Sequence, residues 1–130
     1  MPDLRRRVRR PKGLAIIFAE ANHARLHAGL SLACAAAAMD RPVRLFFHGE
    51  SVCALQQGRR WGGDTPYEAA GLATLAGLIA QTQELGVAIM ACPTGLHLCG
   101  LDAANLDERM ETGGLIAFMA MAKADELLLA

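Results

Sequence analysis

Short apolar runs that alternate with helical stretches constrain the fold of this chain more than any other feature of its sequence. Four such runs, at residues 14–19, 43–48, 87–91 and 125–130, are predicted to be strands. The first three are almost continuously apolar, which is typical of strands that are buried on both faces. Because helical patterns separate the runs, we expect a mainly parallel sheet with helices on both of its faces.

The segments between these runs are predicted to hold the helices. Alanine and leucine dominate residues 23–39, and Asn22 before them is a candidate N-cap. A second long helix is expected over residues 67–85, with Gly86 as its C-cap. Shorter helical segments are expected at residues 50–57, in a helix or turn after Pro93, and at residues 114–123.

The region 58–66 is the least regular part of the chain and is predicted to be an exposed loop. A fifth strand, if present, is expected either there or within residues 99–107. The fold class predicted from these elements is a three-layer α/β/α sandwich with a mainly parallel sheet of four to five strands.

The length of 130 residues suits a single domain, and charge is unevenly distributed along it. The formal net charge is zero, but six of the 13 basic residues lie within the first twelve positions, beside one acid. Residues 1–13 are therefore predicted to be a basic, flexible tail, and residues 14–130 the folded domain. Since that domain is acidic overall, a nucleic-acid partner is not expected.

Apolar runs and cysteines indicate the cellular compartment of the protein. The longest nearly apolar stretch, 29–39, is too short to cross a bilayer, so no membrane association is expected. No secretory signal is recognisable, and four cysteines among many core residues do not resemble a disulfide framework. Cys34 is predicted to lie in the core and Cys53 to be half-buried. These features predict a cytoplasmic protein whose thiols are reduced.

Motifs for metals and cofactors are weak in this chain. His23 and His27 have the i, i+4 spacing of a metal pair, but no third ligand lies near them in the sequence. The glycine pairs at 62–63 and 113–114 are too short for a phosphate-binding or dinucleotide-binding motif. We therefore expect no metal and no organic cofactor.

Cys92 is the strongest candidate for chemistry, because ligands of parallel α/β sheets bind beyond the carboxyl ends of the strands. It directly follows the strand predicted at 87–91, and Pro93 suits the first turn of a helix. At such a helix start, the backbone N–H groups of Thr94 and Gly95 would stabilise a thiolate. A thiolate attacks disulfides, persulfides or peroxides, and the alternative is a packed, inert cysteine.

Other side chains near the strand ends could assist Cys92. His48 ends the second predicted strand, and His97 lies between Cys92 and Cys99. Cys99 is seven residues beyond Cys92, about 10 Å along a continuous helix. That spacing is too long for a disulfide between the two unless a glycine bends the segment.

Four segments, in this order and spacing, carry a family resemblance that spans residues 14–130. They read ACAAAAM at 33–39, VRLFFHGESV at 43–52, GVAIMAC at 86–92, and GGL at 113–115 continuing to ADELLL at 124–129. In these segments the chain resembles the DsrE/DsrF-like family of small sulfur-relay proteins. It differs from the common family pattern in its basic tail, in Pro93 and in the insertion at 59–64.

The resemblance implies a three-layer α/β fold with a five-stranded, mainly parallel sheet, and assembly into dimers, trimers or hexamers. In sulfur-transferring members, a cysteine just after this strand carries persulfide sulfur between partner proteins, and Cys92 matches that position. The chain is therefore predicted to be an intracellular sulfur-relay protein, sulfurtransferase-like if active, that exchanges sulfur with donor and acceptor proteins. Two alternatives stay open: a non-catalytic oligomeric small-ligand-binding or scaffold protein, and a peroxide reductase that uses Cys92 and Cys99.

Overall fold

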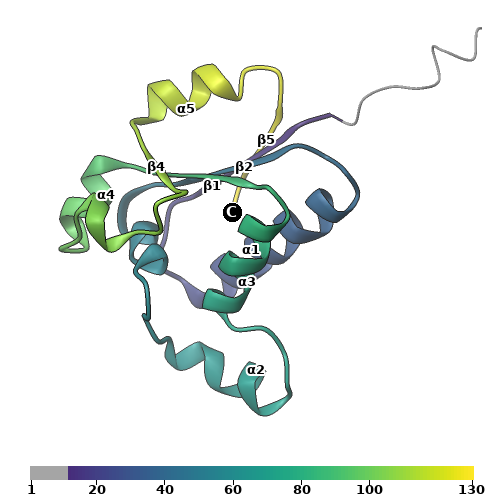
Figure 1. Ribbon diagram of the computed structural model, residues 1–130, viewed down its shortest axis with the longest axis vertical. Coiled ribbons are helices and arrows are strands. Elements are labelled where there is room, and N and C mark those ends of the chain that lie inside the picture. Colours follow the sequence, from purple (N-terminus) through teal and green to yellow (C-terminus); the bar gives the residue numbers. More distant parts are fainter. Residues whose placement is uncertain (1–11) are drawn as a thin grey trace, which may run out of the picture.

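The computed structural model describes residues 12–130, which form a five-stranded sheet with helices on both faces (Figure 1). The strand order is β4-β3-β2-β1-β5, and every neighbouring pair is parallel. This architecture is the three-layer α/β/α sandwich that the sequence predicts. Of the predicted basic tail, residues 1–11 lie outside the described part of the chain.

Four strands form where the apolar runs predict them. They are β1 (Leu14–Phe18), β2 (Val43–Phe47), β3 (Ala88–Ala91) and β5 (Glu126–Leu129). Most side chains of β1, β2 and β3 are buried, as expected for strands that helices cover on both faces. Most of β5 is exposed, because it lies at one edge of the sheet.

The fifth strand, β4 (Glu111–Thr112), corrects the prediction, which placed it within residues 58–66 or 99–107. It is only two residues long, and both are exposed. Its place at the other edge rests on backbone pairing with β3, in which Met90 lies opposite Glu111. A strand this short carries no alternating apolar pattern, so the sequence does not indicate it.

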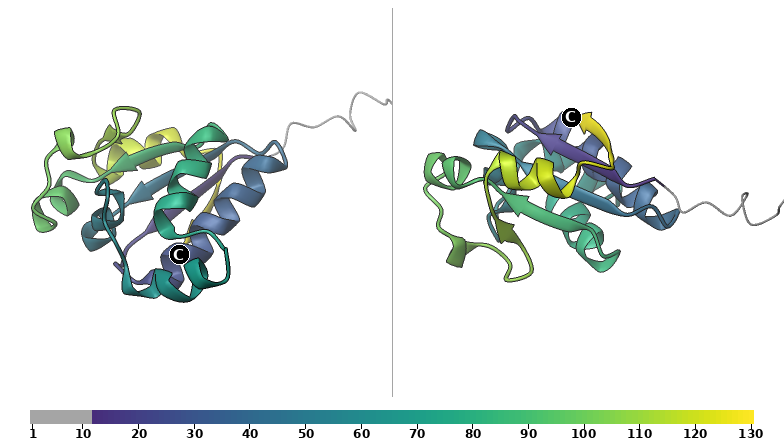
Figure 2. Two further views of the ribbon diagram at one scale, coloured as in Figure 1. Left: turned by 60° about the horizontal axis from the view of Figure 1, so that its bottom comes forward. Right: turned by 90° about the horizontal axis from the view of Figure 1, so that it is seen from above.

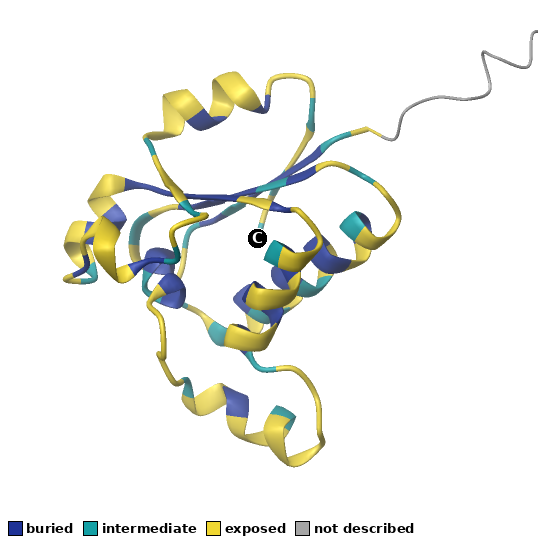
Figure 3. Cartoon of the chain, in the orientation of Figure 1, coloured by how far each residue is buried: buried dark blue, intermediate teal, exposed yellow. Residues whose placement is uncertain are grey.

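Helices cover the two faces of the sheet unequally (Figure 2). On one face, α1 (His23–Ala38) and α3 (Leu75–Glu84) pack against each other. On the other face lies α5 (Leu115–Met121), whose Phe118 ring centroid is 5.0 Å from that of Phe46 in β2. Most of the outer surface of α5 is exposed in the single chain (Figure 3).

Local capping sets the ends of α1 and α3. The side chain of Asn22 accepts a hydrogen bond from the N–H of Arg25 at 3.0 Å, which confirms Asn22 as the N-cap of α1. The hydroxyl of Thr74 accepts one from the N–H of Gly77 at 3.1 Å and caps α3 in the same way. Gly86 has a φ of 81°, a left-handed conformation that favours glycine, and it ends α3 as predicted.

The single helix predicted over residues 67–85 is wrong, since two helices occupy this region. α2 (Thr65–Ala69) ends shortly before Gly71, which has a φ of 71°. That left-handed residue turns the chain away from the helix axis, and α3 begins only after its own cap at Thr74. The helical composition is continuous across this break, which is why the pattern predicts one helix.

Shorter helices form at the other predicted places. The segment 50–57 is a 3₁₀ helix, η2 (Gly49–Leu55), and the residues after Cys92 form α4 (Pro93–Leu98). These two elements pack against each other beyond the carboxyl ends of β2 and β3. None of the helices in residues 12–130 is long and apolar enough to span a membrane.

The prediction of an exposed loop at 58–66 is wrong for Asp64, which is only 5% exposed. Its carboxylate is hydrogen-bonded to His23 Nε2 at 2.7 Å and accepts from the N–H of Leu75 at 3.1 Å. Asp64 therefore ties the loop to the first turns of both α1 and α3. Its partners lie 41 and 11 residues away in sequence, and loop composition does not indicate such distant contacts.

Replacing Asp64 by alanine is expected to lower the free energy of unfolding by about 1–3 kcal/mol, because buried donors lose their acceptor. Denaturant unfolding followed by circular dichroism measures this change. Glu68→Ala, at an exposed position of α2, is the control and should change stability by less than about 0.5 kcal/mol. Equal unfolding midpoints for the Asp64→Ala and unaltered proteins would contradict this role.

Candidate functional site

Cys92 lies at the carboxyl end of β3 and is the N-cap of α4. Pro93 occupies the first turn of that helix, a position its fixed φ favours. The N–H of Gly95 donates a hydrogen bond to Cys92 Sγ at 3.1 Å. The structure thus places Cys92 at a helix start, with an amide of the first turn directed at its sulfur.

A second amide, which the sequence does not predict, reaches the sulfur from η2. The N–H of Gly49 donates to Cys92 Sγ at 3.2 Å. The parallel register places Phe47 opposite Ala91, and the N–H of Cys92 donates to the carbonyl of Phe47 at 3.0 Å. Gly49 is thereby held beside the sulfur. A glycine just after a predicted strand, at the same sheet edge as Cys92, was the available signal.

The helices α4 and η2 approach each other so closely that position 95 requires glycine. A Cβ atom there would collide with the side chain of Val52 and with the carbonyl oxygen of Gly49. Cys92 itself is only 4% exposed. Its sulfur therefore lies in a narrow space between two short helices, and each of them contributes one N–H donor.

The other predicted residues of the site are not bonded to the sulfur. Among the hydrogen bonds of residues 12–130, those that reach Cys92 Sγ come from Gly49 and Gly95, and none comes from Thr94. His48 is exposed, and its ring centroid is 6.1 Å from that of Phe46. His97, in the last turn of α4, is exposed as well. Neither histidine orients the thiol in this structure.

Cys99 forms a disulfide with Cys53, which corrects the prediction that the cysteines are unpaired. The two Cα atoms are 5.4 Å apart, although 46 residues separate them in sequence. Cys53 lies in η2 and Cys99 is the C-cap of α4, so the packing of these helices brings the two together. The alternative of a peroxide reductase that uses Cys92 and Cys99 loses its second thiol in this pairing.

Cys34 and Cys92 are the free cysteines of the described residues, and both are buried. Burial raises the pKa of the Cys34 thiol above its ordinary value, so this cysteine is suited to the core role predicted for it. Its Sγ donates to the carbonyl of Leu78 at 3.8 Å. Within residues 12–130, no group of three or more metal-ligating side chains comes together, and His23 and His27 gain no further ligand.

Comparison with known proteins identifies the family of this chain. The pattern that describes the DsrE/DsrF-like family matches residues 12–129, which include every strand and helix described above. The chain belongs to the DsrE/DsrF-like family. No curated protein matches it.

Solved structures share the fold of this DsrE/DsrF-like chain. The YchN protein of E. coli superposes with a TM-score of 0.72 at 19% sequence identity, over 91% of this chain and 97% of YchN. A protein of unknown function from Methanobacterium thermoautotrophicum, MTH1491, superposes at 0.63 with 15% identity, over 92% and 99% of the two chains. BT1422 of Bacteroides thetaiotaomicron, also of unknown function, reaches 0.66 with 14% identity, over 92% and 95%. These likenesses show the fold alone.

Replacing Gly95 by alanine is expected to lower the free energy of unfolding by about 1–3 kcal/mol, since the added Cβ has no space between α4 and η2. Equilibrium unfolding in urea measures the change. Gly77→Ala in α3 is the matched control, because a Cβ there would meet its nearest neighbour at an ordinary 3.4 Å. The control should be neutral or stabilise by up to about 1 kcal/mol. If the two variants were equally stable, the close approach at Gly95 would be disproved.

Proposed function

We propose that this protein is a sulfur carrier, in which Cys92 receives persulfide sulfur from a donor protein and passes it to an acceptor protein. The observation that carries the proposal is the pair of backbone N–H groups, from Gly49 and Gly95, that donate to Cys92 Sγ. A thiolate that is buried away from water needs hydrogen-bond donors of this kind. We place this activity in the cytoplasm, where thiols are kept reduced.

The proposed transfer balances without a further co-reactant. The Cys92 thiolate attacks the outer sulfur of a donor persulfide, R–S–SH, and a Cys92–S–SH persulfide forms. The bond between the two donor sulfurs breaks, and its electron pair leaves on R–S⁻, which takes up a proton. An acceptor thiolate then attacks the outer sulfur on Cys92, and Cys92 returns to its thiolate.

The two amides act on the charge that appears at Cys92 Sγ in this cycle. The sulfur is anionic before it attacks the donor and again when the acceptor removes the outer sulfur. Both donors are backbone groups, and they are directed at the sulfur while η2 and α4 are packed together. The site therefore supplies electrostatic stabilisation, and the partner proteins supply the reacting sulfurs.

Incubation of the thiol-reduced protein with a low-molecular-weight persulfide is expected to add about 32 Da, the mass of one sulfur atom, to Cys92. Intact-protein and peptide mass spectrometry measure the gain and its position. Cys92→Ser should abolish it, whereas Cys34→Ala should leave it unchanged, because Cys34 is a core residue of α1. Sulfur found on Cys34, or on no cysteine, would refute the carrier and favour the non-catalytic alternative.

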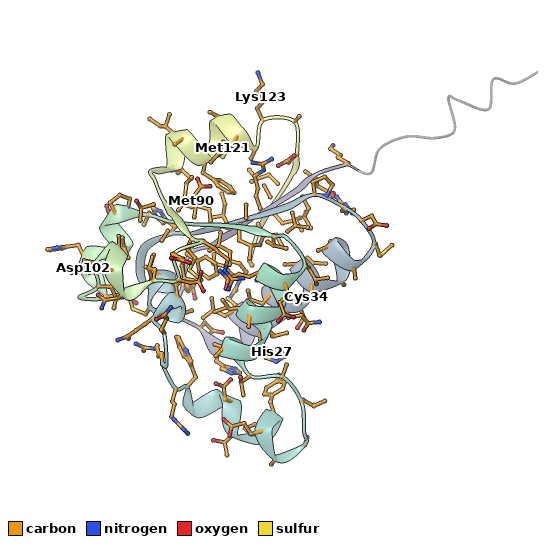
Figure 4. The ribbon with its side chains drawn as sticks, viewed as in Figure 1. His27, Cys34, Met90, Asp102, Met121 and Lys123 are labelled. Atoms are coloured by element: carbon orange, nitrogen blue, oxygen red, sulfur yellow. A yellow bond between two sulfur atoms is a disulfide. The ribbon has the colours of Figure 1, made fainter. Side chains whose placement is uncertain are left out.

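We further propose that a second copy of the chain covers α5. This helix reads LIAFMAM and contains no charged or polar side chain, yet only Phe118 is buried in the single chain. A helix that is apolar on every side is normally buried on every side. Ile116 is 88% exposed, and a groove of about 100 Å³ lies beside the helix, lined in part by Met90 of β3 and Met121 of α5 (Figure 4).

The edge strand β5 extends this apolar surface. Leu129 lies opposite Ile17 in β1, and Ile17 lies opposite Phe46, the residue that contacts α5. Paired residues of neighbouring strands share a face, so Leu129, and Leu127 two residues before it, lie on the α5 face of the sheet. Both are exposed. Interfaces between permanently associated copies of one chain are apolar in this way, which supports a homo-oligomer.

Ile116→Glu is expected to dissociate this oligomer, since a charge would enter an apolar interface. Size-exclusion chromatography with light scattering measures the mass in solution. Leu72→Glu is the matched control, because Leu72 is 60% exposed in the turn after α2, away from α5. A monomeric unaltered protein, or an Ile116→Glu protein of unchanged mass, would contradict the proposed interface.

A further inference from the structure

Cys92 is almost completely covered, although a sulfur carrier must meet the sulfur of a partner. Only 4% of the residue is exposed. Its sulfur lies between η2, which contributes the N–H of Gly49, and α4, which contributes the N–H of Gly95. Val52 of η2 also packs directly against Gly95. Attack at the sulfur therefore requires these two short helices to separate.

The disulfide joins the same two helices. Cys53 lies four residues after Gly49 in η2, and Cys99 lies four residues after Gly95 at the end of α4. Each half of the disulfide is thus about one helical turn beyond the residue whose amide binds Cys92. A covalent bond at this place holds η2 against α4 and keeps Cys92 buried between them.

Both disulfide residues are half-buried, in contrast to the buried Cys92, so small thiols can reach them. Disulfides of proteins in reducing compartments are mostly transient and redox-sensing. The exposure of Cys53 and Cys99 fits a bond that opens and closes with the surrounding thiol pool.

We infer that the Cys53–Cys99 disulfide controls access to Cys92: the oxidised protein holds the site closed, and reduction lets η2 and α4 separate so that persulfide sulfur can reach it. This inference rests on the proposed carrier function and names its regulation. In the opening step, two low-molecular-weight thiols, RSH, reduce the disulfide to two cysteine thiols and are themselves oxidised to RSSR. Closing is the reverse reaction with RSSR as the oxidant, so atoms and electrons balance in both directions.

The direct alternative, in which Cys53 or Cys99 itself attacks sulfur on Cys92, is not what the geometry favours. Cys92 and Cys99 occupy opposite ends of the six-residue α4. Cys53 is separated from Gly49, the nearest part of η2 to the sulfur, by a turn of helix that contains the buried Val52. The disulfide is therefore placed to hold the two helices together rather than to react with Cys92.

The test compares two variants in which Cys92 is the single free thiol. Cys34→Ala leaves Cys92 free and the disulfide intact, whereas Cys34→Ala combined with Cys53→Ser and Cys99→Ser leaves Cys92 free and removes the disulfide. The rate of alkylation of Cys92 by iodoacetamide is followed by intact mass in each variant. We expect alkylation at least about tenfold faster without the disulfide, because local opening then exposes the sulfur. Equal rates would overturn the inference.

Two further measurements distinguish a variant whose fold is disturbed from an inference that is wrong. The Cys34→Ala protein is also alkylated after reduction, with Cys92 read in its own peptide fragment, and its rate should rise as in the triple variant. In the second measurement, the unaltered protein is oxidised by a low-molecular-weight disulfide and then denatured without a reductant, and its free thiols are counted. Two thiols are expected, from Cys34 and Cys92, and four would overturn the inference.

The carrier function and the accessibility of Cys92 are measured by separate experiments. Loading with a persulfide reports sulfur on Cys92, whereas alkylation reports only how often the thiol is exposed. If alkylation is faster without the disulfide but no sulfur is gained, the control of access stands and the carrier function fails. If sulfur is gained equally fast with and without the disulfide, the carrier function stands and the control of access fails.

Discussion

β2 and β3 pair in a parallel register in which Phe47 lies opposite Ala91, and both strands end at this level. Because the two strands run in the same direction, the segments that follow them leave the sheet side by side. Gly49 comes from one segment and Cys92 from the other, and the hydrogen bond from the N–H of Cys92 to the carbonyl of Phe47 sets their relative height. The two amides at the sulfur and the disulfide beyond them depend on this pairing.

The two surfaces on which partners are proposed to bind lie at different places around the sheet. α1 and α3 cover one face completely enough to bury their inward leucines, and Asp64 ties the first turns of both helices together. The other face is left to the seven residues of α5, so the apolar side chains of α5 and β5 stay exposed. Cys92 belongs to neither face, because it lies beyond the carboxyl ends of the strands. An oligomer formed through α5 and a sulfur partner at Cys92 therefore use different parts of the molecule.

The four cysteines show how far sequence reasoning reaches. Cys34 sits in a helix of alanines and leucines, and this composition predicts its burial. Cys92 is recognisable because a buried strand precedes it and a proline follows it. Cys53 and Cys99 carry no such local sign, since their pairing depends on two helices that meet from segments 46 residues apart. Spacing made a bond from Cys99 to Cys92 unfavourable without a bend in the segment, but it could not name the residue that Cys99 pairs with.

The other features that the sequence predicts correctly depend on local interactions. The four longer strands, the caps at Asn22 and Gly86, and the helix start at Cys92 were determined by the sequence itself, because each depends on residues a few positions apart. The edge strand β4, the buried Asp64, the amide of Gly49 at the sulfur and the disulfide were decided only by the tertiary structure. Each of these joins segments that are distant in the chain, and such contacts exist only once the sheet has paired and the helices have packed on it.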